Sequence, residues 1–83
     1  MIAVSDLPPG ASGVIERLDD SGPIGLRLLE LGFVPGTPVE VVRRAPLGDP
    51  TVYAVRGTRF CLRRTEASRI LVRPAEPALA GGR

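Results

Sequence analysis

Short stretches of alternating apolar and polar residues, separated by dense turn signals, run through most of this chain. A first strand is predicted near residues 13–18, where the apolar positions are Val14, Ile15 and Leu18. A second strand, ending at residues 43–44, is predicted where Val39 and Val41 alternate with Glu40. A last short strand is expected around Ile70 and Val72.

Two further strands, residues 51–56 and 58–63, are predicted to form a hairpin hinged at Gly57. Whether the tight loop is 56–57 or 57–58, the parity of the strands assigns the same residues to each face. One face holds two of the three aromatic residues and is the expected core face: Tyr53, Val55, Phe60 and Leu62. The other face carries Arg56, Arg59, Cys61 and Arg63, together with Val52 and Ala54.

A helix is predicted from Pro23, which suits a first helical position, to Leu31. Gly32 follows where a left-handed C-cap residue belongs. At 100° per residue, one apolar stripe of the helix should face the sheet. Arg27 and Glu30 lie beside this stripe and are expected to form an ion pair. That stripe consists of Ile24, Leu28 and Leu31.

Leu26 and Leu29 fall on the other side of the predicted helix. Two neighbouring leucines on so short a helix form an apolar patch if they are exposed. We therefore interpret them as partner-binding residues, which would contact another protein or a second copy of this chain. The alternative is a helix that lies in a groove and is buried nearly all round.

Turn chemistry completes the predicted architecture. Pro35 and Gly36 are typical of a type II turn, and Thr65 is expected to cap a single helical turn over residues 66–68. The result is a mainly β fold: a partly open barrel of about five strands, with one short helix between strands 1 and 2. Residues 1–73 form the predicted domain, and the composition of residues 74–83 predicts a disordered tail.

The composition bounds the class of protein. Its 83 residues suffice for one domain, and the single cysteine, Cys61, cannot form an internal disulfide and is expected to be a buried reduced thiol. The N-terminus does not resemble a signal peptide, and no apolar run is long enough to span a membrane. A cytoplasmic protein is therefore expected.

Candidate chemistry is sparse. There is no histidine, and Asp19 and Asp20 are adjacent loop residues that are expected to be solvated. This inventory predicts no catalytic residue, no metal site even for iron, and no cofactor, so the protein is not expected to be an enzyme. The glycines fit turns rather than a phosphate-binding loop, which argues against a nucleotide site.

The net charge is +2, and every basic residue is an arginine because the chain contains no lysine. Arginines gather on the predicted outer face of the hairpin, which carries Arg56, Arg59 and Arg63, and Arg43, Arg44 and Arg64 lie near it in sequence. This cluster suggests nucleic-acid binding as an alternative function. A solvated face or a contact with an acidic protein surface is also compatible with these charges. Single-strand binders add aromatic stacking residues, and none is spare here.

Several segments, in order and spacing, resemble the FeoA family over about residues 5–73. They are Ser5-Asp6-Leu7-Pro8-Pro9-Gly10, Arg27-Leu28-Leu29-Glu30-Leu31-Gly32-Phe33-Val34-Pro35-Gly36-Thr37, Ala45-Pro46-Leu47-Gly48-Asp49-Pro50 and Leu62-Arg63-Arg64-Thr65-Glu66-Ala67. The resemblance implies an SH3-like barrel. It also implies an accessory protein that binds the cytosolic side of FeoB, a ferrous iron permease with a GTPase domain, and modulates its assembly or its GTPase and transport activity.

Overall fold

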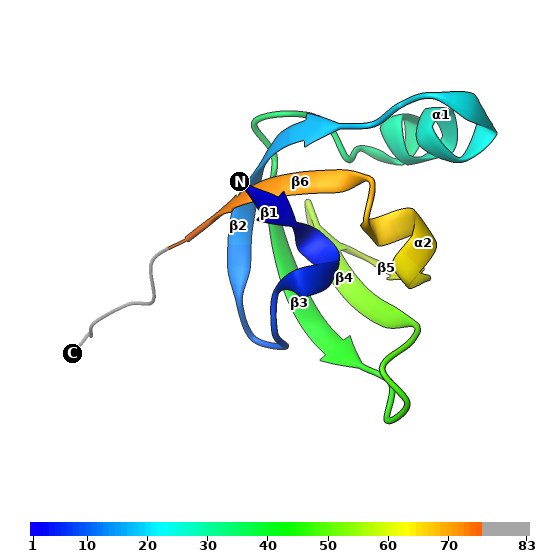
Figure 1. Ribbon diagram of the computed structural model, residues 1–83. Coiled ribbons are helices and arrows are strands. Elements are labelled where there is room, and N and C mark those ends of the chain that lie inside the picture. Colours follow the sequence, from blue (N-terminus) through cyan, green and yellow to red (C-terminus); the bar gives the residue numbers. More distant parts are fainter. Residues whose placement is uncertain (76–83) are drawn as a thin grey trace.

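Six strands form one antiparallel sheet, in the order β1-β6-β2-β3-β4-β5, in a computed structural model that describes residues 1–75 (Figure 1). The sheet curls around a single core, and helix α1 stands at one end of it. The elements are β1 (Ile2–Ala3), η1 (Val4–Asp6), β2 (Ser12–Leu18), α1 (Gly22–Leu31), β3 (Pro38–Arg44), β4 (Thr51–Val55), β5 (Thr58–Leu62), α2 (Arg64–Ala67) and β6 (Ile70–Pro74).

The inward face of the β4–β5 hairpin, as strand parity predicts it, forms part of the core. In the β4–β5 hairpin, Tyr53 pairs with Phe60, and Tyr53, Val55 and Leu62 are almost fully buried. Phe60 is partly buried, and its ring meets that of Phe33 edge to face with the centroids 5.2 Å apart. The predicted core face of the hairpin is therefore confirmed, and the third aromatic residue is also internal.

The first residues of the chain add a sixth strand that the sequence analysis missed. Strand β1 pairs with β6 through only two residues, Ile2 with Val72 and Ala3 with Leu71. The short helix η1 then brings Val4 into the core, where it is completely buried. A two-residue strand is too short to show a period of two, which explains why the prediction counted five strands.

The single helical turn before β6 begins earlier than predicted. Arg63, not Thr65, is its N-cap, and Thr65 lies inside α2. The Glu66 carboxylate accepts a hydrogen bond of 2.8 Å from the Arg63 backbone N–H, so an acidic side chain in the first turn supplies the capping contact. The predicted cap by Thr65 is therefore wrong.

The turns that close the fold use positive backbone angles. Arg56 and Gly57 have φ angles of 54° and 79°, and Val55 pairs with Thr58, so the hairpin loop is 56–57 with the signs of a type I′ turn. Gly36 has a φ of 89° and follows Pro35 in a turn closed by the Thr37 N–H and the Val34 carbonyl.

Strand β6 continues to Pro74, opposite Gly13, and Ala75 donates a backbone hydrogen bond of 2.9 Å to the Ser12 carbonyl. Regular pairing therefore extends past residue 73, where the sequence placed the end of the domain. The rest of the tail predicted for residues 74–83 lies outside the described residues.

Replacement of Gly32 by valine is expected to destabilise the protein by about 1–3 kcal/mol. Gly32 ends helix α1 with a φ of 109°, a left-handed conformation that a β-branched residue strongly disfavours. Thermal unfolding followed by circular dichroism measures the effect, which corresponds to a loss of several degrees in melting temperature for a domain of this size. Thr58→Val, at an exposed strand position, is the control; equal melting temperatures for the two variants would contradict the cap.

Candidate partner-binding surfaces

Helix α1 leaves apolar side chains in solvent. Leu26 is 53% exposed and Ile24 is 40% exposed, whereas Leu28 is completely buried. Leu29, which the sequence analysis paired with Leu26, is partly buried. Of the two predicted partner-binding leucines, the structure therefore exposes Leu26 well and Leu29 only in part.

The fully buried residues of α1 are Gly25 and Leu28. Of the predicted stripe, Leu28 is buried and Leu31 packs against the core, whereas Ile24 is exposed. Gly25 packs directly on the backbone before the helix: a Cβ atom there would lie 2.5 Å from Asp20 Cα and 2.6 Å from the Asp19 carbonyl oxygen. The first turn of the helix therefore packs through Gly25, and Ile24 is left exposed. The prediction that Ile24 faces the sheet is therefore wrong.

Helix α1 is tied to α2 by an ion pair. The Arg27 guanidinium lies 2.9 Å from the Glu66 carboxylate, instead of pairing with Glu30 as predicted. Glu66 also accepts the hydrogen bond from the Arg63 backbone, so one carboxylate serves both helices. An ion pair between two elements far apart in sequence cannot be found from helical spacing, which considers only neighbours at i+3 and i+4.

A second candidate surface is the outer face of strands β3, β4 and β5. Arg59 and Arg63 are exposed on it, and Cys61 lies between them on β5. The register aligns Cys61 with Val52 and Val52 with Arg43, so a third exposed arginine stands two strands away. Arg56 lies in the hairpin turn, where its guanidinium is 3.5 Å from the Thr37 hydroxyl.

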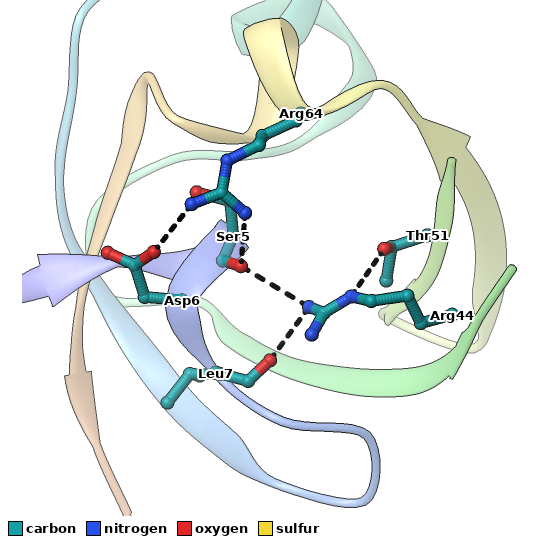
Figure 2. A network of polar contacts seen from close by, with 6 residues as sticks. All are labelled: Ser5, Asp6, Leu7, Arg44, Thr51 and Arg64. Carbon is teal, nitrogen blue, oxygen red and sulfur yellow. Dashed lines mark hydrogen bonds and ion pairs between the residues drawn. The ribbon is translucent and has the colours of Figure 1, made fainter. Parts of the chain in front are cut away.

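Two of the six arginines considered for this face instead bond to η1 and its neighbours, Arg44 from a partly buried position and Arg64 from an exposed one (Figure 2). Arg44 donates to the carbonyls of Leu7 and Ser5, at 2.8 and 3.3 Å, and to the Thr51 hydroxyl at 2.9 Å. Arg64 approaches the same Ser5 carbonyl at 3.5 Å and the Asp6 carboxylate at 3.0 Å. These contacts join η1 to the end of β3 and the start of α2, so both guanidinium groups have a structural role.

Cys61 is exposed, which corrects the expectation of a buried thiol. Its neighbours Phe60 and Leu62 face inward, and the alternation of the strand turns the residue between them outward. The burial typical of free cysteines is a tendency of the residue type, and the strand parity overrides it.

A hollow lies between β2, α2 and β6. It is lined by Arg17, Asp19, Thr65, Ser68, Arg69 and Leu71. The Arg69 guanidinium donates to the carbonyls of Ser21 and Asp19, at 2.8 and 3.3 Å, and lies 3.7 Å from the Asp19 carboxylate. The hydroxyl and backbone N–H of Ser21 lower the pKa of Asp19, which stays ionised beside the arginine. The Arg69 guanidinium is therefore already bonded within the chain and is not free to bind an anion in this hollow.

Side chains that could bind a metal ion are not clustered within residues 1–75. This part of the chain contains no group of three or more cysteine and acidic side chains that could hold a metal ion, and Asp19 and Asp20 are exposed. Burial raises the pKa of the Tyr53 phenol, so it remains neutral in the core. None of the described helices has the length and apolar content needed to cross a membrane.

Comparisons with known proteins identify close relatives. A family profile for the FeoA domain matches residues 2–74. The Fe(2+) transport protein A/Fe(2+) transporter FeoB fusion protein of Porphyromonas gingivalis is 41% identical over 69 residues, which cover 83% of this chain and 8% of that protein.

Solved structures give the same result. FeoA of Stenotrophomonas maltophilia, complexed with zinc and described as a procaryotic SH3 domain protein, is 40% identical with a TM-score of 0.79, over 88% of this chain and 91% of the other. Iron(II) transport protein A of Clostridium thermocellum is 41% identical with a TM-score of 0.82, over 88% and 45%. The predicted SH3-like, mainly β fold is thereby confirmed.

Proposed function

The chain belongs to the FeoA family, and from this premise we propose that it is an accessory protein of ferrous iron uptake that binds the cytosolic side of a FeoB-type permease. The observation that carries the proposal is the fusion protein of Porphyromonas gingivalis, in which a homologous segment and a FeoB transporter share one chain. Fusion keeps two partners at high effective concentration, which benefits proteins that act in contact. This chain spans only 8% of the length of that relative.

The proposed role is that of an adaptor, not an enzyme, which modulates the assembly of the permease or its GTPase and transport activity. The sequence contains no histidine, and the arginines within residues 1–75 are either exposed or bonded to main-chain and side-chain oxygens. A role as a ferrous iron transport activating factor has been suggested for the Stenotrophomonas maltophilia protein, which agrees with an accessory function.

Leu26 on helix α1 is the residue that we place at the contact with the permease, with partly buried Leu29 beside it. An exposed leucine on a helix that is anchored by buried Leu28 and the Arg27–Glu66 ion pair can enter a partner's pocket without reordering the helix. Ile24 adds apolar area at the start of the same helix. The alternative occupant of this surface is a second copy of the chain.

The experiment is co-purification of the tagged protein with the permease encoded in the same genome, with the isolated GTPase domain as a second bait. The wild-type chain is expected to retain the permease. Leu26→Ser is expected to weaken binding by roughly 4–12-fold, because burial of the exposed half of a leucine contributes about 0.8–1.5 kcal/mol. Glu40→Ser, an exposed change on strand β3 opposite Ser12, should bind like the wild type.

The outcomes separate three possibilities. Failure of the wild-type chain to bind either bait would refute the proposed partnership. Binding that is equal for the wild type and Leu26→Ser would remove Leu26 from the interface but keep the partnership. A dimer of the free chain that Leu26→Ser dissociates would assign the surface to self-association.

Nucleic-acid binding, the alternative function, has less support. Arg44 and Arg64 are already bonded to other residues of the chain, and all three aromatic residues lie in the core or pack against it. Stacking platforms for bases are therefore missing from the described surface.

A further inference from the structure

The loop between β3 and β4 carries the most exposed large apolar side chain of the described residues. Leu47 is 97% exposed, compared with 53% for Leu26 on helix α1. The loop projects from the barrel at the end opposite α1 (Figure 1). It is therefore a separate feature from the helical surface, and no core contact explains why a leucine stands there.

This loop is held in shape by backbone hydrogen bonds. The Gly48 N–H donates to the Ala45 carbonyl at 2.8 Å, which closes a turn with Pro46 and Leu47 at its two central positions. Proline at the first central position and glycine at the fourth are typical of a type I turn. The Ala45 N–H bonds to the Pro50 carbonyl at 3.0 Å and closes the base of the loop.

A contact with another element fixes the loop relative to the barrel. The Asp49 carboxylate accepts a hydrogen bond of 2.8 Å from the Arg64 backbone N–H, at the start of α2. Leu47 is consequently presented on a preorganised support, and its burial by a partner would cost little ordering of the backbone.

Two free arginines flank the loop. Arg43 precedes it on β3, and Arg63 lies on the other side because Leu62 pairs with Thr51, the residue that follows the loop. Both are exposed, and neither makes an ion pair within residues 1–75. By contrast, Arg73 on β6 is paired with Glu16 on β2 at 2.9 Å.

We propose that Leu47, flanked by Arg43 and Arg63, is a second contact surface, which inserts into an apolar pocket rimmed by carboxylates on the partner protein. An apolar anchor surrounded by arginines is a frequent composition of interface hot spots, and guanidinium groups bind carboxylates in pairs of hydrogen bonds. The inference rests on the proposed function in one respect: the partner that we test is the FeoB-type permease.

A protein pocket fits this surface better than a lipid bilayer does. The loop offers one leucine and no exposed aromatic side chain, whereas even a whole acyl chain gives only marginal membrane binding. A pocket can instead bury the whole leucine and leave Asp49 on its hydrogen bond to α2.

The test measures binding to the detergent-solubilised permease at about 50 and about 500 mM salt, with equal melting temperatures required of all variants. Leu47→Ser is expected to lose at least roughly tenfold in affinity at both salt concentrations, because the leucine side chain contributes to binding through apolar burial, which salt does not screen. The double variant Arg43→Ser/Arg63→Ser should lose at least roughly fivefold at low salt and little at high salt, because salt screens its ion pairs. Arg17→Ser/Arg73→Ser removes the same charge from β2 and β6 and should bind like the wild type.

Three results would overturn the inference, and they are distinguishable. If the wild-type chain binds and both test variants bind equally well, this surface is not used, while the proposed function stands. If the wild-type chain does not bind, the proposed function fails and this surface loses its partner. If the protein sediments with vesicles of phosphatidylglycerol and phosphatidylethanolamine in a Leu47-dependent manner and does not bind the solubilised permease, the loop contacts lipid instead.

Discussion

Gly25→Ala is expected to destabilise the protein by about 2 kcal/mol or more, although alanine is ordinarily the better helix former by about 1 kcal/mol. The added methyl group would lie 2.5 Å from Asp20 Cα and 2.6 Å from the Asp19 carbonyl oxygen, closer than real Cβ atoms approach such neighbours. Both neighbours are backbone atoms, which cannot rotate away. The helix would therefore have to move outward and lift Leu28 from the core.

Urea unfolding monitored by circular dichroism measures this effect. Glu30→Ala serves as the matched control, because it introduces the same residue at an exposed position of the same helix. The control should be within about 0.5 kcal/mol of the wild type. A Gly25→Ala variant at least as stable as the wild type would show that the helix does not approach the preceding loop as closely as the structure has it.

Gly25 also explains why the sequence did not predict the buried face of helix α1 correctly. The periodic pattern of Ile24, Leu28 and Leu31 counts apolar side chains, and a glycine contributes none. Yet the closest packing of α1 occurs at Gly25, where the absence of a side chain lets two backbones meet. A sequence pattern that weighs only side chains therefore places the buried face about one residue out of position.

Strand parity was a better guide because it depends on neighbours whose burial is unambiguous. Tyr53, Val55 and Leu62 fix the inner face of the hairpin, and the outward direction of Cys61 follows from them. Residue-type preference alone predicted the opposite for this cysteine. The pattern of alternating residues thus carries more information than the average burial of one residue type.

Features made by tertiary contact leave no such pattern. Arg44 reads as one more arginine at the end of a strand, and only the folded chain brings it to the carbonyls of Ser5 and Leu7 (Figure 2). Leu47 lies in a loop rich in proline and glycine, where a single leucine has no period. Its significance depends on its exposure and on the two arginines beside it, which the sheet register supplies.

Leu28→Ser is expected to destabilise the protein by about 3–5 kcal/mol, the largest effect of any substitution considered. Leu28 is completely buried and belongs to the core cluster with Phe33 and Ile15. The substitution removes apolar volume and inserts a hydroxyl group that has no evident partner there. A domain of this size has a thin core and limited total stability, so much of the population would be unfolded at room temperature.

Leu26→Ser provides the matched comparison, since it is the same chemical change two residues away on the same helix. Because Leu26 is 53% exposed, its replacement should cost no more than about 0.5–1 kcal/mol. Chemical unfolding of both variants, with the same denaturant dependence as the wild type, measures the difference directly. Equal destabilisation by the two serines would mean that Leu26 packs as fully as Leu28, and the helix would then have no free apolar side chain to offer the permease at that position.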